Sequence, residues 1–130
     1  MATKLFVNLP VQDLGRSKAF FTALGLDFFG QSDDMASVII SEHTQVMLLA
    51  EATFASYARK GVADATANTE VILVLGVETR EQVDELAGRA EAAGGQPAGA
   101  PRDEGYRYQR GFTDLDGHHW EALCLIGPAS

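Results

Sequence analysis

The chain has 130 residues, of which 46% are hydrophobic and 22% charged, as in a single globular domain. Its formal net charge of −8 repels nucleic-acid phosphates and anionic lipid heads, so we expect neither a nucleic-acid nor a membrane partner. Cys124 is the only cysteine, which excludes an internal disulfide. No apolar run reaches the ~18 residues of a membrane span, and Pro10 and Asp13 come too early for a signal peptide. We therefore expect a soluble cytoplasmic protein.

The first half of the chain reads as one strand, one helix and three further strands. The apolar run "KLFVNL" (4–9) predicts a strand that ends at Pro10. Asp13 can cap a helix that Gly25 ends, with an apolar face that includes Phe20 and Phe21. Three β-rich runs follow, namely "LDFFG", "MASVIIS" and "TQVMLLA".

The second half repeats this order. "TEVILVLGV" (69–77) predicts a strand, and the helix after it has Thr79 as cap with Gln82 three places on, a capping-box arrangement. Gly94 and Gly95 end this helix. After the Gly/Pro loop "QPAGAPRDEG" come two strands, "YRYQRGFT" and "HHWEALCLI", joined by the turn "DLDG".

The two halves are related by a nearly constant offset. Val11 matches Val77, and the hairpin "VIISEHTQVMLL" lies over "FTDLDGHHWEAL". The pattern predicts an α+β fold of two βαβββ modules, about 4–50 and 69–126, joined by a connector at 51–68. Two curved sheets with helices outside would then enclose a cleft.

The sequence resembles the glyoxalase / bleomycin-resistance / extradiol-dioxygenase (vicinal oxygen chelate) superfamily over nearly its whole length. The resemblance is carried by "NLPVQDLGRSKAFFTALG", "VETREQVDELAGRAEAAGG" and "FTDLDGHHWEAL". It implies a glyoxalase-like fold, a cupped mixed sheet with helices outside, usually in a homodimer. In metal-dependent members a divalent ion in the cup chelates the substrate and stabilises an oxyanion or enolate.

The resemblance also implies which four positions would hold the metal. The first strand of each module would supply Phe6 and Ile72, and the last strand of each would supply Met47 and Glu121. Phenyl and sec-butyl groups offer no lone pair, and a thioether suits copper(I) better than the ions of this family. We therefore expect no cofactor and no metal site of the standard type.

A rearranged metal site is the alternative. Strand residues alternate between faces, so His119 and Glu121 share a face and can act as neighbouring ligands. A third ligand would have to come from Asn8, Gln45 or Glu70, and Gln45 is the first-module counterpart of His119. His118 has the opposite parity and is interpreted as a turn or surface residue.

Glu121 is the candidate catalytic residue, as a general base or as a counter-ion for a cationic ligand; the alternative is an internal ion pair. Its partner depends on the hairpin register. If the turn is tight, Arg110 lies opposite Glu121; if it is one residue longer, Gly111 does and Arg110 points away. Tyr108 shares the parity of Arg110. The predicted ligand-binding residues are Phe6, Asn8, Met47, Ile72, Tyr108, Arg110 and His119.

Other side chains have structural interpretations. Trp120 and Cys124 share the face that should meet the helices, so we expect a core tryptophan and a buried, unreactive thiol. Asp114 and Asp116 are interpreted as turn formers rather than catalytic carboxylates. Tyr57 in the connector belongs either to a lid or to a solvated surface helix.

The functional predictions follow from an apolar cleft with one acid. The first is a metal-independent binding or resistance-type protein for a small amphipathic or cationic molecule. The second is a metal-dependent lyase, isomerase or dioxygenase built around His119 and Glu121. The third is a structural dimer whose cleft is filled by side chains. Whether the protein is an enzyme stays open at this point.

Overall fold

The computed structural model describes residues 3–126, which divide into two compact units at the Asp64–Ala65 junction. Each unit holds a mixed β-sheet with one long helix on one face, so the predicted α+β class with helices outside is confirmed. The boundary falls inside the predicted connector 51–68. Among the described residues, none of the helices has the length and apolar character needed to span a bilayer.

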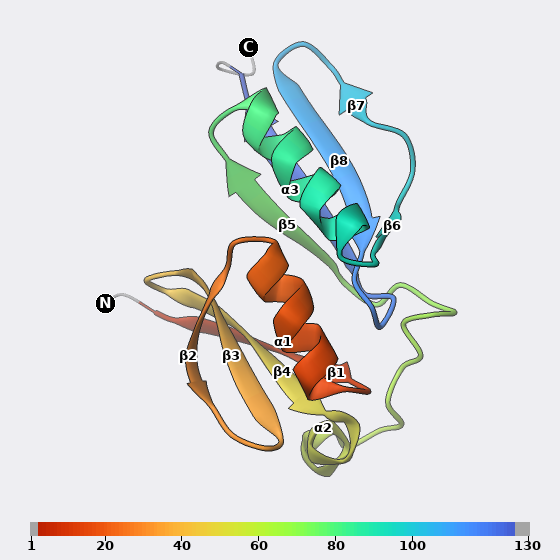
Figure 1. Ribbon diagram of the computed structural model, residues 1–130. Coiled ribbons are helices and arrows are strands. Elements are labelled where there is room, and N and C mark those ends of the chain that lie inside the picture. The colour runs from red at the N-terminus through yellow and green to blue at the C-terminus, as the bar shows by residue number, and fades with distance from the viewer. Residues whose placement is uncertain (1–2, 127–130) are drawn as a thin grey trace. The chain divides into compact units, whose positions relative to one another are not determined.

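The first unit has strand order β1-β4-β3-β2 (Figure 1). Its first strand runs parallel to its last, and the other neighbours are antiparallel. The elements are β1 (Leu5–Val11), α1 (Leu14–Ala23), β2 (Asp27–Gln31), β3 (Met35–Ser41), β4 (Thr44–Ala50) and α2 (Glu51–Tyr57).

Helix α1 begins where the sequence predicts. The Asp13 carboxylate accepts a hydrogen bond from the Arg16 N–H at 3.0 Å, which satisfies one of the unpaired donors of the first turn. Gly25, at φ 92°, follows the last turn. Phe20 and Phe21 are buried and meet edge to face, and α1 lies over β3 and β4. The core of this unit therefore lies between α1 and one face of the sheet.

Helix α2, within the predicted connector, has no buried residue. Tyr57 is 68% exposed. Of the two interpretations of this segment, the solvated surface helix fits the first unit as described.

The second unit has strand order β5-β9-β8-β6, with β7 paired to β8. The first strand again runs parallel to the last. The elements are β5 (Ile72–Val77), α3 (Arg80–Ala92), β6 (Gln96–Pro97), β7 (Arg102–Asp103), β8 (Arg107–Thr113) and β9 (His119–Leu125). The Gly/Pro loop thus holds two strands of two residues where the first unit has the full strand β2.

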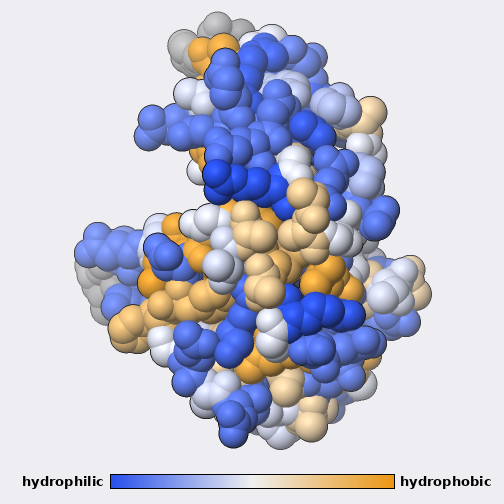
Figure 2. Space-filling model, in the orientation of Figure 1, coloured by the Kyte–Doolittle hydropathy of each residue, from blue (hydrophilic) through white to orange (hydrophobic). Residues whose placement is uncertain are grey.

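Helix α3 carries the predicted capping box: Thr79 accepts from the Gln82 N–H, and the Gln82 side chain accepts from the Thr79 N–H. Its buried side packs on Ala122 and Cys124 through Val83. Trp120 and Phe112 are also fully buried, and their nearly parallel rings stack with the ring centroids 6.5 Å apart. Both predictions about the helix-facing side of β9, a core tryptophan and a buried thiol, are confirmed. The outer surface over α3 is predominantly hydrophilic (Figure 2).

Candidate functional site

The two sheets repeat the same register. In the first, Phe6 lies opposite Gln45 and Asn8 opposite Met47. In the second, Ile72 lies opposite His119 and Val74 opposite Glu121. The predicted equivalences of Gln45 with His119 and of Met47 with Glu121 are therefore confirmed. The antiparallel neighbours extend the match, because Ser37 lies opposite Met47 as Gly111 lies opposite Glu121.

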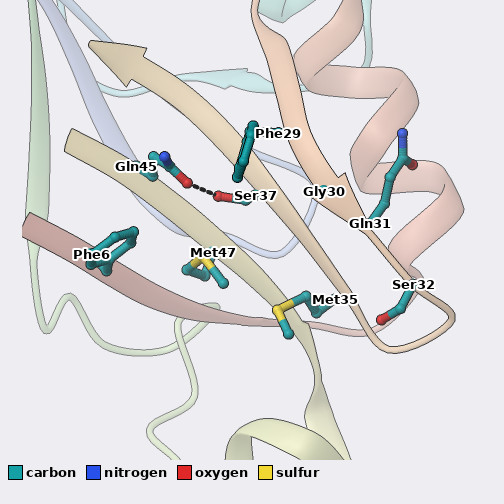
Figure 3. A pocket seen from close by; sticks show the side chains of 9 residues that line it. All are labelled: Phe6, Phe29, Gly30, Gln31, Ser32, Met35, Ser37, Gln45 and Met47. Carbon is teal, nitrogen blue, oxygen red and sulfur yellow. Dashed lines mark hydrogen bonds between the residues drawn. The ribbon is translucent and has the colours of Figure 1, made fainter. Parts of the chain in front are cut away.

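A hollow of about 330 Å³ lies on the face of the first sheet that α1 leaves open. This volume is at the lower end of the range for small-molecule sites. The hollow brings together two predicted ligand-binding residues, Phe6 and Met47 (Figure 3). The full lining is Phe6, Phe29, Gly30, Gln31, Ser32, Met35, Ser37, Gln45 and Met47.

The chemistry of this hollow is mainly apolar. Two phenyl rings and two thioethers line it, and the lining contains no ionisable side chain among the described residues. Phe6 is 52% exposed and Phe29 68%, so both rings present surface that a ligand can cover. Methionine side chains adapt to irregular shapes, which suits a site for varied apolar molecules.

One hydrogen-bonded pair interrupts the apolar lining. The Ser37 hydroxyl donates a short hydrogen bond to Oε1 of Gln45, from β3 to β4 (Figure 3). Ser37 is buried at 4% exposure, whereas Gln45 is partly exposed. Asn8 is exposed on β1 beside Met47 in the register, but it is not part of the lining.

The open face of the second sheet carries a polar trio, which we call the Glu121 trio. Its members are Gln109, His119 and Glu121. Nε2 of Gln109 donates to one carboxylate oxygen of Glu121 at 2.9 Å, and Nε2 of His119 lies 2.5 Å from the other. The side chains of His119 and Glu121 are 22% and 13% exposed. The predicted neighbour relation of His119 and Glu121 is confirmed, and Glu121 is held within its own sheet.

Gly111 makes room for this carboxylate. A Cβ at this position would stand 2.3 Å from Oε2 of Glu121 and 2.7 Å from the carbonyl oxygen of Ala98. Real Cβ atoms do not approach other atoms so closely, and a backbone carbonyl cannot move aside cheaply. The absence of a side chain at residue 111 is therefore what lets Glu121 lie across β8.

The hairpin register corrects two predicted ligand-binding residues. Gly111 lies opposite Glu121, which is the longer-turn alternative, so Tyr108 and Arg110 point to the helix side of the sheet. Arg110 pairs with Asp84 and Glu91 of α3, both at 3.2 Å. Tyr108 donates its hydroxyl to Asp84 at 2.6 Å. Neither residue shares a face with Glu121.

These contacts on α3 shift two pKa values. The Tyr108 hydroxyl, and after it Arg110, hold the pKa of Asp84 below its ordinary value, because both stabilise the ionised carboxylate. The same hydrogen bond, helped by partial burial, raises the pKa of Tyr108. This cluster joins helix to sheet and has a structural role.

The turn after β8 is organised by a buried acid. Asp114 is 5% exposed and accepts from the backbone N–H of Asp116 and His118 and from Nε1 of Trp120 at 3.0 Å. Burial raises the pKa of Asp114, while these donors and His118 oppose the shift. The turn-forming interpretation of Asp114 is confirmed. Of the two interpretations of His118, the turn residue is confirmed and the surface residue is wrong, since His118 is bound in this turn and only 7% exposed.

The donor set does not fit the family's metal. Three of the four implied positions are Phe6, Met47 and Ile72, and Glu121 is already bound by His119 and Gln109. Within residues 3–126, no group of three His, Cys, Asp or Glu side chains has the geometry to hold a metal ion. We derive no metal-dependent step from this set.

Four residues that matter here were not singled out from the sequence. Phe29, Met35 and Ser37 line the hollow, and Gln109 binds Glu121. Met35 and Ser37 could have been found from the sequence. Side chains alternate along the strand "MASVIIS", and its pairing with the strand of Met47 puts Met35 and Ser37 on the same face as Met47. Gln109 needed the register of the second hairpin, which the sequence left open.

Comparison with known proteins identifies relatives of the whole chain. The family model for the glyoxalase/bleomycin resistance protein/dioxygenase superfamily matches residues 5–122. A hypothetical protein from S. aureus is 33% identical, with a TM-score of 0.82 over 95% of this chain and 94% of the other. No curated protein sequence gives a significant match.

More distant solved structures share the fold. A glyoxalase-related enzyme from Fulvimarina pelagi has a TM-score of 0.82 at 18% identity, covering 95% of this chain and 88% of that one. A genomically encoded fosfomycin resistance protein from Listeria monocytogenes has a TM-score of 0.69 at 18% identity, covering 99% and 96%. At these identities the likeness concerns the fold alone.

Proposed function

Because the chain belongs to the glyoxalase/bleomycin resistance protein/dioxygenase superfamily, we propose that it binds a small amphipathic molecule without the family's metal, as a binding or resistance-type protein. The observation that carries the proposal is the 330 Å³ apolar hollow that includes the predicted residues Phe6 and Met47. Fold resemblance alone gives no activity, so the argument rests on this hollow.

The energetics favour an aromatic or aliphatic ligand. Half-exposed rings such as Phe6 leave apolar surface in water, and covering it contributes about 25 cal/mol for each Å² removed from water. The lining offers no carboxylate to a cation and no ammonium or guanidinium group to an anion, among the residues described. A neutral amphipathic ligand therefore suits this hollow better than the cationic one considered from the sequence.

Methionine-methyl NMR gives a direct test. The chain has three methionines, and two of them, Met35 and Met47, line the hollow. We expect neutral aromatic probes to shift these two ¹³C-methyl signals. Single Met→Leu variants provide the assignments.

A matched pair of variants sharpens this test. Phe6 and Leu5 are neighbours on β1 with similar exposure, 52% and 58%, but Phe6 lines the hollow and Leu5 does not. Phe6→Ser should weaken binding, whereas Leu5→Ser should not. A panel of probes that moves neither methionine signal, or equal losses in both variants, would contradict the proposal.

The second candidate is the metal-dependent lyase, isomerase or dioxygenase, and the adjacency of His119 and Glu121 is the observation in its favour. Elemental analysis of protein purified without chelators tests it. One equivalent of a divalent ion that disappears in Glu121→Gln would support this candidate, and an ion content at background would remove it.

The proposal also includes a homodimer, as the family resemblance implies, and a cytoplasmic location, as expected from the composition and the start of the sequence. Light scattering coupled to size exclusion measures the mass of the particle. A mass twice the 13.9 kDa of the chain supports the dimer, and the mass of one chain contradicts it.

A further inference from the structure

We propose that Gln45 selects the ligand: its side-chain amide N–H₂ donates to a hydrogen-bond acceptor on an otherwise apolar aromatic molecule, such as an aryl ketone. This inference rests on the proposed function, because it concerns the same hollow. It names the chemical class of the ligand, which the apolar lining alone does not.

The orientation of the Gln45 amide is fixed by Ser37. A serine hydroxyl has a single hydrogen, and that of Ser37 is donated to Oε1 of Gln45. Ser37 is 4% exposed, so water does not compete freely for this hydrogen bond. With the oxygen held toward Ser37, the nitrogen lies on the other branch of the amide (Figure 3).

That nitrogen is an available donor. Within the described part of the chain, the hydrogen bonds of Gln45 leave Nε2 without a protein acceptor. Ser37 has no second hydrogen to give to a ligand. The Gln45 amide is therefore a directional donor of the hollow, beside the Phe6 ring that lies opposite it in the register.

Binding an apolar molecule would cover this donor. A buried N–H that loses water without gaining an acceptor costs free energy, so a ligand that supplies the acceptor is favoured over an isostere that does not. The rest of the lining is phenyl, thioether and backbone, together with the side chains of Gln31 and Ser32, which bind Lys18 and Asp34. Phenyl and thioether groups tolerate many shapes. Shape is loosely specified here, and the acceptor gives the selectivity.

Three probes of similar size separate the possibilities. Acetophenone carries a carbonyl acceptor, isopropylbenzene has a methyl group in its place, and 1-phenylethylamine presents a protonated donor. We expect acetophenone to bind about three- to tenfold more tightly than isopropylbenzene, as for one net hydrogen bond. The ammonium probe should bind least, because it faces another donor. Titrations followed at the methyl signals of Met35 and Met47 measure all three affinities.

Gln45→Glu is the decisive variant. It keeps the size of the side chain and an oxygen for Ser37, but removes the donor and adds a charge. We expect it to abolish the preference for acetophenone and to favour the ammonium probe. Gln96→Glu, on the exposed two-residue strand β6, adds the same charge and serves as the control with wild-type selectivity.

A second variant covers the case in which Gln45→Glu fails to fold. Gln45→Leu has no polar group, so it should bind isopropylbenzene at least as tightly as acetophenone. Wild-type protein that binds both neutral probes equally, or a ketone preference that persists in Gln45→Leu, would overturn the inference while leaving the proposed function intact. If no probe binds the wild-type protein, the proposed function itself fails.

Discussion

The open faces of the two sheets have the same register and different chemistry. Where the first sheet places Met47 and Gln45, the second places Glu121 and His119. Where the first has the small polar side chain of Ser37, the second has Gly111. The first face is an apolar hollow with one Ser37–Gln45 hydrogen bond, and the second carries a carboxylate that its own neighbours bind.

This difference shows that the duplicated backbone does not determine the site. Both sheets direct these positions to the face that the helix leaves open, so backbone geometry decides which residues are available. The side chain at each position then decides whether the face can bind an apolar ligand or instead holds a carboxylate, as Glu121 is held by its neighbours. Exchanging residues at equivalent positions separates these two contributions.

The largest effect is expected for Gly111→Ser, which gives the second sheet the residue of the first. The new Cβ meets Glu121 and the carbonyl of Ala98, so we expect a loss of about 3 kcal/mol in the free energy of unfolding, at the upper end for overpacking. The sole tryptophan, Trp120, lies in this unit, so urea unfolding followed by its fluorescence reports the change.

Two controls accompany this variant. Gly88→Ala lies on the exposed side of α3, where a Cβ meets no atom within 4 Å, and should stabilise the protein by up to ~1 kcal/mol. Adding Glu121→Ala to Gly111→Ser should recover only part of the loss, because the Ala98 carbonyl remains in place. A Gly111→Ser variant with unchanged free energy of unfolding would show that Glu121 does not need the space left by the missing side chain at residue 111.

The next effect concerns the turns of the two hairpins. Asp114→Ala leaves two backbone N–H groups and the indole N–H of Trp120 without their acceptor, which should cost about 2 kcal/mol. Glu42 lies exposed in the corresponding turn of the first sheet, and Glu42→Ala should change stability by less than ~0.5 kcal/mol. Equal costs measured by urea unfolding would contradict the special role of the second turn.

A smaller effect is expected for Met47→Glu, which puts the acid of the second sheet into the first. Met35 stands where the second sheet has Gln109, so the hollow lacks one of the two donors that hold Glu121, and Gln45 takes the place of His119. We expect the affinity for neutral aromatic probes to fall about tenfold, which corresponds to about 1.4 kcal/mol. Met47→Leu, which conserves volume and polarity, should bind as the wild type does.

The smallest effect concerns the helix faces and depends on pH. Unit one packs α1 with phenyl rings, whereas unit two adds the pairing of Arg110 with Asp84 and Glu91. Arg110→Gln should lose less than about 1 kcal/mol at pH 7, because Asp84 is 52% exposed and solvent screens the pair.

The sign of the pH dependence follows from the lowered pKa of Asp84. A carboxyl whose pKa is lower in the folded state contributes stability above its unfolded value, and this contribution disappears as the pH falls through the folded pKa. The difference between wild type and Arg110→Gln should therefore narrow below the ordinary value of 3.8. Arg89→Gln removes an exposed pair with Glu85 and should change the stability at pH 7 by less than ~0.5 kcal/mol. A constant difference would assign the effect of Arg110 to packing.

Much of the fold could be predicted from the sequence because its signals are local. Asp13 and Thr79 start helices by binding backbone N–H groups within one turn, and both do so in the structure. The repeat then fixed the equivalences of Gln45 with His119 and of Met47 with Glu121, since both last strands begin after a turn at matching positions.

The site was harder to predict because it depends on contacts across the chain. Whether Arg110 or Gly111 faces Glu121 depends on the length of the turn between β8 and β9, and a difference of one residue exchanges the two. That length is stabilised by the indole of Trp120, six residues beyond Asp114, and a single side-chain hydrogen bond within a hairpin leaves no periodic signal in the sequence. The short strands β6 and β7 were likewise hidden in a Gly/Pro loop, where composition favours turns.

The parallel pairing of β1 with β4, and of β5 with β9, has a consequence for how the protein is made. In each sheet the first strand in the sequence pairs with the last, so neither sheet is complete until its final strand has left the ribosome. The first unit can close while the second is still being synthesised. Until β4 has been synthesised, the edge of the apolar strand β1 that pairs with it stays unpaired. The time needed to synthesise β4 therefore sets how long this edge of β1 can take part in aggregation.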